Sequence, residues 1–214
     1  MLIGIVGFIG SGKGTVGDYL ESSWQFKKDS FANPLKDALS IIFGWDRELL
    51  EGQTKESREW REKIDYGWSK IIGKEISPRI AMQLFGTECI RNVFHPNVWS
   101  ASLIKRYETF YHDVVVTDCR FKNEIKSIKD AGGYIIKVKR GDNPEWYERY
   151  KKHINNPLKI KELRDNGIIP HVSETDWIGS KFDIIIENNN SLMDLYANID
   201  INMHILYNMK NRKI

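Results

Sequence analysis

The sequence has few cysteines, no long apolar run and almost no net charge, and each shortage excludes a class of protein. Its two cysteines, Cys89 and Cys119, lack metal-site spacing, so neither a disulfide framework nor a zinc site is predicted and a reducing compartment is expected. No run approaches the ~20 apolar residues that span a bilayer. The 32 Lys and Arg residues nearly balance 29 Asp and Glu, so we expect neither a nucleic-acid nor a membrane partner.

The remaining composition is that of a globular chain. With 41% hydrophobic and 29% charged residues in 214, it is expected to bury a core as a single domain, 1–214, with an inserted segment. The apolar start from Met1 to Gly10 has no preceding basic residue and no signal-peptide cleavage pattern. We therefore interpret this start as a strand and expect a cytoplasmic protein.

Short apolar, β-branched runs alternate with helical patterns along the chain. The runs predict strands at residues 2–8, 25–31, 113–117, 134–139 and 182–187. The helical patterns occupy residues 12–22, 35–43, 79–93, 97–109, 122–131 and 192–209. This alternation predicts the α/β class, with a mainly parallel sheet covered by helices on both faces.

Two stretches differ from this pattern. The first, Asp46 to Gly73, is highly charged with tryptophans at helical intervals, which predicts an exposed helical insertion over about 46–75. The second, Arg140 to Trp177, is polar and rich in Lys, Asn and Pro, with little apolar periodicity. It is predicted to be a mobile lid or loop region over about 141–178.

A glycine-rich turn joins the first strand to the first helix. Gly7 to Lys13 has the frame G-x-x-x-x-G-K, in which converging backbone N–H groups and one lysine hold phosphates. This phosphate loop predicts a P-loop NTPase fold that binds ATP and Mg²⁺. Gly14 separates the lysine from Thr15, an arrangement that resembles the Gly-Lys-Gly-Thr loop of adenylate-kinase-like enzymes. We therefore expect Thr15 to be a magnesium-side ligand, directly or through water. The predicted ATP-binding residues are Gly10, Ser11, Gly12, Lys13, Gly14 and Thr15.

An apolar strand that ends in an aspartate suggests the second half of this site. Val114 to Asp118 would deliver a carboxylate to Mg²⁺ beside the phosphate loop, and Arg120 would project from the same strand end. An aspartate at this place can instead cap a helix, and an arginine can instead form a surface salt bridge. We predict that Lys13, Asp118 and Arg120 are catalytic.

The absence of one motif and of an obvious base favours a small kinase. The Asn-Lys-x-Asp element that reads guanine in GTPases does not occur. A phosphate acceptor is largely ionised at neutral pH, with a second pKa of about 6, so its phosphorylation needs no general base.

Five ordered segments give the chain a specific resemblance to the bacteriophage deoxynucleoside monophosphate kinases, P-loop enzymes that use ATP to convert dNMP to dNDP. The segments are Gly7 to Thr15, Phe31 to Leu39 (FANPLKDAL), Arg79 to Glu88, Val116 to Glu124 (VTDCRFKNE) and His171 to Glu174. The chain differs from the family pattern at Asn33, where glycine is usual, and at Gly14, where aspartate is frequent.

The resemblance implies a helical NMP-binding insertion, a lid and a set of residues that bind the acceptor nucleotide. The implied set is Leu35, Lys36, Arg58, Arg79, Gln83, Gly86, Thr87, Trp99, Asp118, Arg120 and Glu124. Small-molecule nucleotides are thus the expected partners, and a homodimer is left open.

Other interpretations of these residues remain. Lys36, Arg58 and Arg79 are also typical of a solvated surface. Gln83 on an apolar helix face can be a satisfied structural amide, and Trp99 can be a core residue. The chain could also phosphorylate another small acceptor such as dephospho-coenzyme A, or bind nucleotides as a sensor without catalysis.

Overall fold

The computed structural model describes residues 1–211, which divide into two compact units. The sheet unit comprises residues 1–30 and the residues from 106 onward, and the helical unit comprises residues 31–105. The chain enters the helical unit after β2 and leaves it along α6 (Val98–Thr109).

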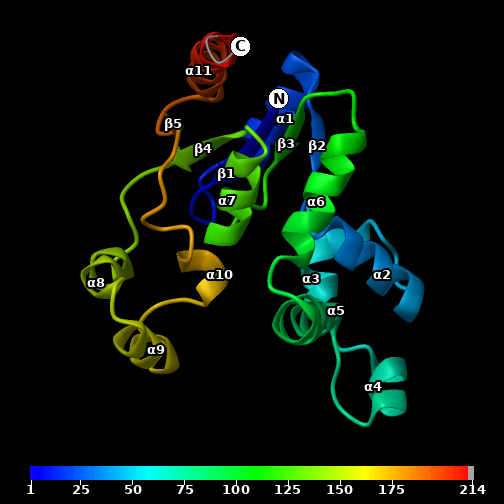
Figure 1. Cartoon of the computed structure of the whole chain (residues 1–214). Helices are drawn as coiled ribbons and strands as arrows, with labels where there is room; N and C mark the ends of the chain where they lie inside the picture. The colour runs from blue at the N-terminus through cyan, green and yellow to red at the C-terminus, as the bar shows by residue number, and fades with distance from the viewer. Residues whose placement is uncertain (212–214) are drawn as a thin grey trace. The chain divides into compact units, whose positions relative to one another are not determined.

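Five parallel strands form the sheet unit's framework, in the order β2-β3-β1-β4-β5 (Figure 1). They are β1 (Leu2–Val6), β2 (Lys27–Asp29), β3 (Val114–Val116), β4 (Tyr134–Lys139) and β5 (Ile184–Glu187). The predicted strands and the parallel α/β class are confirmed, although most strands are shorter than predicted. β1 lies in the centre because all its residues are apolar or glycine, as burial on both faces requires.

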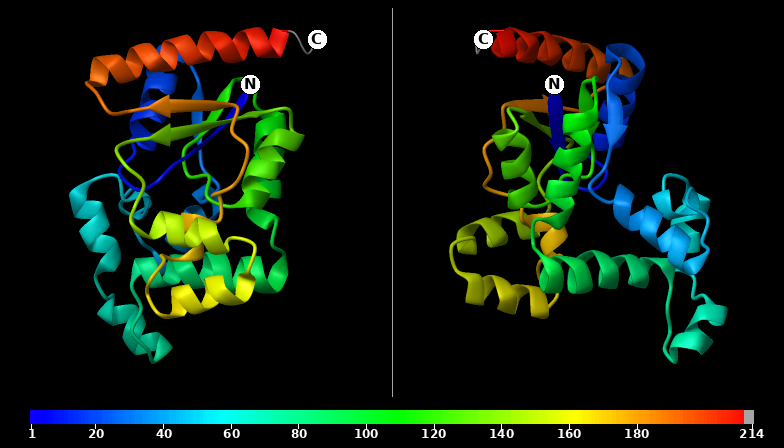
Figure 2. Two further views of the ribbon diagram at one scale, coloured as in Figure 1. Left: turned by 90° about the vertical axis from the view of Figure 1, so that its left-hand side faces the viewer. Right: turned by 45° about the vertical axis from the view of Figure 1, so that its right-hand side comes forward.

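Helices cover both faces of this sheet. Ile3 and Ile136 share one core with α1 (Lys13–Trp24) and α11 (Leu192–Asn211), and α11, red in Figure 2, runs beside β5. Gly4, the residue after Ile3 in β1, faces Ile128 of α7 (Lys122–Asp130) on the other side of the sheet. Neighbouring strand residues point to opposite faces, so the predicted helical layers on both faces are confirmed.

Segment 141–178, predicted to be a mobile lid or loop region, is mostly helical, which its sequence did not indicate. It contains α8 (Trp146–His153), α9 (Pro157–Asp165) and α10 (Val172–Thr175). Each helix is too short, at 8, 9 and 4 residues, to show a clear apolar period in the sequence. Single buried residues such as Tyr150, Leu163 and Trp177 anchor the segment instead.

The helical unit has its own core, which includes Leu39, Trp45 and Leu50. Its elements are α2 (Asn33–Phe43), a 3₁₀ turn η1 (Leu49–Glu51), α3 (Lys55–Glu62), α4 (Tyr66–Ile72), α5 (Pro78–Gln83), a π-helix η2 (Leu84–Phe94) and the start of α6. The predicted helix over 79–93 is therefore divided in two. At its end, the His95 N–H donates to the Ile90 carbonyl, five residues back, at 3.0 Å.

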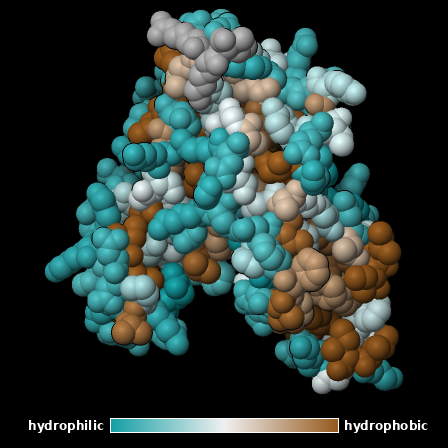
Figure 3. Space-filling view, in the orientation of Figure 1, coloured by the Kyte–Doolittle hydropathy of each residue, from teal (hydrophilic) through white to brown (hydrophobic). Residues whose placement is uncertain are grey.

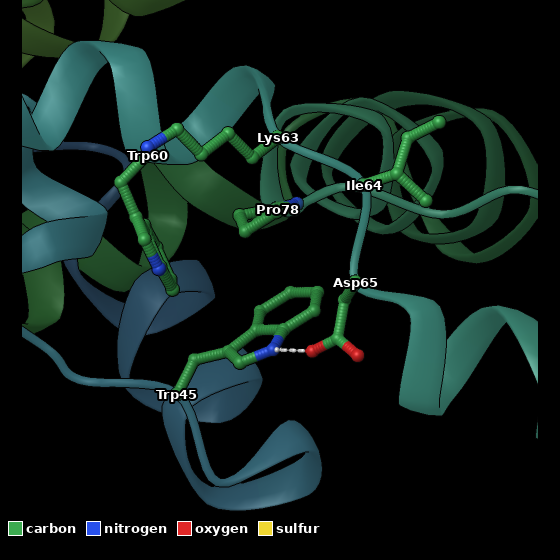
Figure 4. A pocket seen from close by; sticks show the side chains of 6 residues that line it. All are labelled: Trp45, Trp60, Lys63, Ile64, Asp65 and Pro78. Carbon is green, nitrogen blue, oxygen red and sulfur yellow. Dashed lines mark hydrogen bonds between the residues drawn. The ribbon is translucent and has the colours of Figure 1, made fainter.

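A pocket of about 220 Å³ lies within the helical unit (Figure 4). Its lining comprises Trp45, Trp60, Lys63, Ile64, Asp65 and Pro78. The Asp65 carboxylate accepts hydrogen bonds from the Trp68 backbone N–H at 2.9 Å and from the Trp45 indole N–H at 2.8 Å, and these bonds lower its pKa. Asp65 thus joins the start of α4 to the segment after α2. None of the residues predicted to bind nucleotides lines this pocket.

The helical unit also exposes apolar side chains on α2 and α4, seen as brown patches at the lower right of Figure 3. They include Ile41 and Ile42 of α2, and Ile71 and Ile72 of α4. The surface of the charged insertion is therefore partly apolar. No helix within residues 1–211 has both the length and the hydropathy that a membrane crossing requires.

Candidate functional site

The phosphate loop lies between β1 and α1, where the sequence predicts it. Gly12 precedes the first helical residue and has φ 99°, a backbone conformation that favours glycine. A Cβ at Gly12 would lie 2.4 Å from Asn188 Nδ2. The helix N-terminus that follows leaves backbone N–H groups without intrahelical partners, which makes it suited to an anion.

The Lys13 ammonium is hydrogen-bonded to the backbone at the start of the phosphate loop. Its Nζ donates to the carbonyl oxygens of Gly7 and Phe8, both at 2.8 Å. Burial lowers the Lys13 pKa to about 8, and the neighbouring Arg120 cation contributes in the same direction, whereas Glu174 opposes the shift. A cation in this state gains from an incoming anion, because the anion restores its preference for the charged form.

Asn188, at the end of β5, is a loop-positioning residue that the sequence analysis missed. Its buried side-chain Nδ2 donates to the Ser11 carbonyl at 2.8 Å, and its own N–H donates to the Lys139 carbonyl at 2.7 Å. The peptide bond between residues 11 and 12 is trans, so directing its carbonyl toward Asn188 directs the Gly12 N–H the opposite way. No local sequence signal links residues 177 positions apart.

The variant Asn188→Asp is expected to raise the KM for ATP about tenfold with little change in the KM for the acceptor. An ionised carboxylate cannot donate to the Ser11 carbonyl, and an unsatisfied buried carbonyl costs about 1–3 kcal/mol. Asn190→Asp is the matched control, because it adds the same charge at an exposed position two residues away. Steady-state kinetics with each substrate varied in turn would contradict this role if both variants had the same KM for ATP.

The residues around the loop fit a triphosphate and a magnesium ion. The Ser11 hydroxyl is buried and has no hydrogen-bond partner among residues 1–211, and the space where a Cβ would lie at Gly10 or Gly14 is open. Thr15 lies in the first turn of α1. Asp118 follows β3, and one of its carboxylate oxygens accepts from the Ser30 hydroxyl at 2.6 Å. One carboxylate and one hydroxyl beside a polyphosphate are a donor set that Mg²⁺ accepts.

Arg120 lies within electrostatic reach of Lys13 and forms an ion pair with Glu174 of α10. The predicted pocket residue Glu124 is buried, and its Oε2 accepts from the backbone N–H groups of Arg120 and Phe121 at 2.8 and 3.0 Å. In this structure Glu124 therefore fixes the backbone that carries Arg120. The His171-x-Ser-Glu segment supplies the carboxylate that pairs with Arg120.

Aromatic rings connect the segment 141–178 to the phosphate loop. The Phe8 ring makes edge contacts with Trp146 and Tyr147 of α8 and with Trp177 after α10, at centroid distances of 5.5, 5.8 and 4.9 Å. Movement of this segment would therefore change the packing around Phe8, which lies in the phosphate loop.

Several of the predicted acceptor residues lie together in the helical unit. Trp99 donates its indole N–H to the Gly86 carbonyl at 2.8 Å, and a Cβ at Gly86 would lie 2.8 Å from Leu35 Cδ2. Lys36 is buried rather than solvated, because its ammonium pairs with Glu51 at 2.5 Å. Leu35 and Gly86 are thus buried beside the half-buried Trp99, and the charge of Lys36 is already partnered.

The remaining predicted acceptor residues are more exposed. Arg58 donates to the Gln53 carbonyl at 3.0 Å, and Arg79 lies 3.9 Å from Glu62. Thr87 is half-buried in η2. Gln83 is exposed at the end of α5, so the interpretation of its amide as buried on an apolar helix face is wrong. The change from α-helical to π-helical winding after Gln83 alters the direction of later side chains.

Comparison with known proteins finds similar kinases by sequence and by structure. A family model described as deoxynucleotide monophosphate kinase matches residues 52–199, more than half of the chain. A candidate deoxynucleotide monophosphate kinase of Acanthamoeba polyphaga mimivirus is 29% identical, over 93% of this chain and 94% of the relative. The deoxynucleoside-5'-monophosphate kinase of Escherichia phage T5 is 27% identical, over 61% of this chain and 72% of that enzyme. Shikimate kinase from Aquifex aeolicus is 15% identical, over 95% of this chain and 96% of that chain, with a TM-score of 0.44.

Proposed function

The chain belongs to the deoxynucleotide monophosphate kinase family, and from this premise we propose how its residues transfer a phosphoryl group from ATP to a deoxynucleoside monophosphate. The observation that carries the proposal is the phosphate loop, with a half-buried Lys13 ammonium and with Arg120 in electrostatic reach. Phosphoryl transfer requires positioning and charge stabilisation more than covalent chemistry, and these groups supply both.

ATP is the proposed phosphoryl donor, bound by the loop residues Gly10 to Thr15. Asn188 orients the Gly12 N–H, and Lys13 contributes a positive charge to the phosphate that is transferred. Thr15 and Asp118 would hold Mg²⁺, which when bound neutralises part of the phosphate charge. Segment 141–178 is the proposed lid, supported by the contacts of its Glu174 and its aromatic rings.

The helical unit is the proposed binder of the acceptor nucleotide. Trp99 provides a half-buried aromatic ring, packed against the core that includes Leu35 and hydrogen-bonded to the Gly86 carbonyl, and such a ring suits a base or sugar. Arg58 and Arg79 are the proposed ligands of its phosphate. Gln83 and Thr87 are exposed and half-buried, respectively, and are proposed to contact the base. Lys36 would join the acceptor site only after exchanging its present partner Glu51 for the nucleotide.

ATP affinity is expected to fall as pH rises through about 8. Below the Lys13 pKa of about 8 the ammonium is present in the free protein, whereas above it ATP binding must take up a proton. Isothermal titration of metal-free ATP in buffers of different ionisation enthalpy should detect uptake of about half a proton at pH 8, where the ATP phosphates are already ionised, and a larger uptake at pH 9. Proton release at pH 8, or no uptake, would contradict the role given to Lys13.

An acceptor panel tests the proposed function directly. ADP release is measured with ATP·Mg²⁺ and each deoxynucleoside monophosphate, each ribonucleoside monophosphate and dephospho-coenzyme A. We expect turnover with at least one deoxynucleoside monophosphate and none with dephospho-coenzyme A. Tight ATP binding without turnover on any acceptor would identify a nucleotide sensor and reject the proposal.

A further inference from the structure

Arg61, near the end of α3, occupies an unusual place in the helical unit. A Cβ on Gly52 would lie 2.0 Å from both Cζ and Nη2 of the Arg61 guanidinium, so this group rests directly against the backbone at Gly52. Gly52 has φ 66° and ends the turn η1. Glycine at position 52 therefore allows the turn and leaves room for the guanidinium.

The Arg61 guanidinium has a buried donor that nothing in the described chain satisfies. Its Nε is buried and has no hydrogen-bond partner among residues 1–211. Glu51 is within electrostatic reach but already accepts hydrogen bonds from Lys36 and Arg47. A partly buried cation with an unsatisfied donor is destabilising until an anion binds it.

Two further arginines lie beside it. Arg58 is three residues earlier on α3 and thus on the same side of the helix. Arg79 lies on α5, which packs against α3, and its Nε is 3.9 Å from Glu62, the residue after Arg61. Burial and the cations of Arg79 and Arg58 lower the Arg61 pKa, while Glu62 and Glu51 oppose the shift. The cluster therefore holds three guanidinium groups that repel one another.

We propose that Arg61 binds the phosphate of the deoxynucleoside monophosphate, together with Arg58 and Arg79, and that Gly52 provides the space for it. The inference rests on the proposed function and adds a phosphate ligand that the motif comparison did not include. A phosphate dianion suits this site because its oxygens accept several charge-assisted hydrogen bonds from planar guanidinium groups. It also relieves the repulsion among the three arginines.

Kinetics of Arg61→Met test the inference in the full chain. The KM for the preferred deoxynucleoside monophosphate should rise at least tenfold, while the KM for ATP stays within about twofold of wild type. Arg61→Lys should recover part of the loss, because it restores the charge without the planar donor pair. The matched control is Lys55→Met, which removes the same charge from an 87% exposed side chain on the same helix.

A binding comparison separates a phosphate contact from a general loss of structure. Calorimetric titration should show that Arg61→Met weakens binding of the monophosphate but not of the corresponding deoxynucleoside. An unchanged KM for the monophosphate in the active variant, or an equal loss for both ligands, would overturn the inference. Failure of the proposed function would appear instead as a wild-type enzyme without turnover on any deoxynucleoside monophosphate.

Discussion

Replacing Lys13 with methionine is expected to lower kcat for phosphoryl transfer at least about 1,000-fold. The ammonium is the only lysine charge on the phosphate loop, and groups that stabilise transferring phosphate contribute on the order of 10³ to 10⁵ in rate. Methionine retains the length of the side chain but removes the donor that holds the Gly7 and Phe8 carbonyls. Single-turnover measurements with saturating ATP and acceptor would show the loss in the chemical step.

Two comparisons make this result specific. Lys126→Met removes one charge from an exposed lysine of the same unit, which pairs with Asp130 on α7, and should retain wild-type turnover. Thermal unfolding of Lys13→Met should remain cooperative, with Tm lowered by no more than about 4–8 °C, because two hydrogen bonds of about 1 kcal/mol each are lost. Wild-type kcat in Lys13→Met would reject the assignment of the loop.

Replacing Arg120 with methionine is expected to lower kcat/KM for the acceptor by about 10³. The Arg120 guanidinium is within electrostatic reach of Lys13. The backbone N–H of Arg120 donates to the buried Glu124 carboxylate, which fixes the backbone there. The guanidinium is thus held next to the phosphate loop, where negative charge develops during transfer. Steady-state kinetics with the acceptor varied at saturating ATP provide the measurement.

Glu174→Gln is the control for this variant, because both substitutions remove the same ion pair. The pair is partly exposed, with 45% and 22% of the two side chains accessible, so its loss alone should change stability by about 1 kcal/mol or less. Glu174→Gln should retain turnover, or bind the acceptor more tightly, because Glu174 no longer competes for Arg120. If Glu174→Gln lost as much activity as Arg120→Met, the ion pair rather than the arginine charge would be essential.

Charge assignments in the helical unit show where sequence patterns become insufficient. Arg58 and Arg61 occur on the same charged stretch, yet Arg58 is exposed while Arg61 lies half-buried on Gly52, and Lys36 of α2 is buried against Glu51. Hydropathy and periodicity in a sequence indicate whether a side chain tends to be buried. They do not identify the residue with which a buried charge forms an ion pair or hydrogen bond. The partner depends on residues that only packing brings together.

The sequence by itself determined the phosphate loop, the five strands, their parallel class and the aspartate after β3. These features depend on local chemistry: glycines permit the loop, β-branched runs form buried strands, and proline or serine marks the starts of helices such as α5 at Ser77.

Only the tertiary structure decided the contacts that tune this site. Examples are the hydrogen bond from Asn188 to Ser11, the ion pair of Arg120 with Glu174, and the seat of Arg61 on Gly52. The first two join residues that are 177 and 54 positions apart in the sequence. The helices of segment 141–178 are likewise held by single buried residues such as Tyr150 and Leu163. Such contacts are fixed by the packing of distant elements, and no local pattern encodes them.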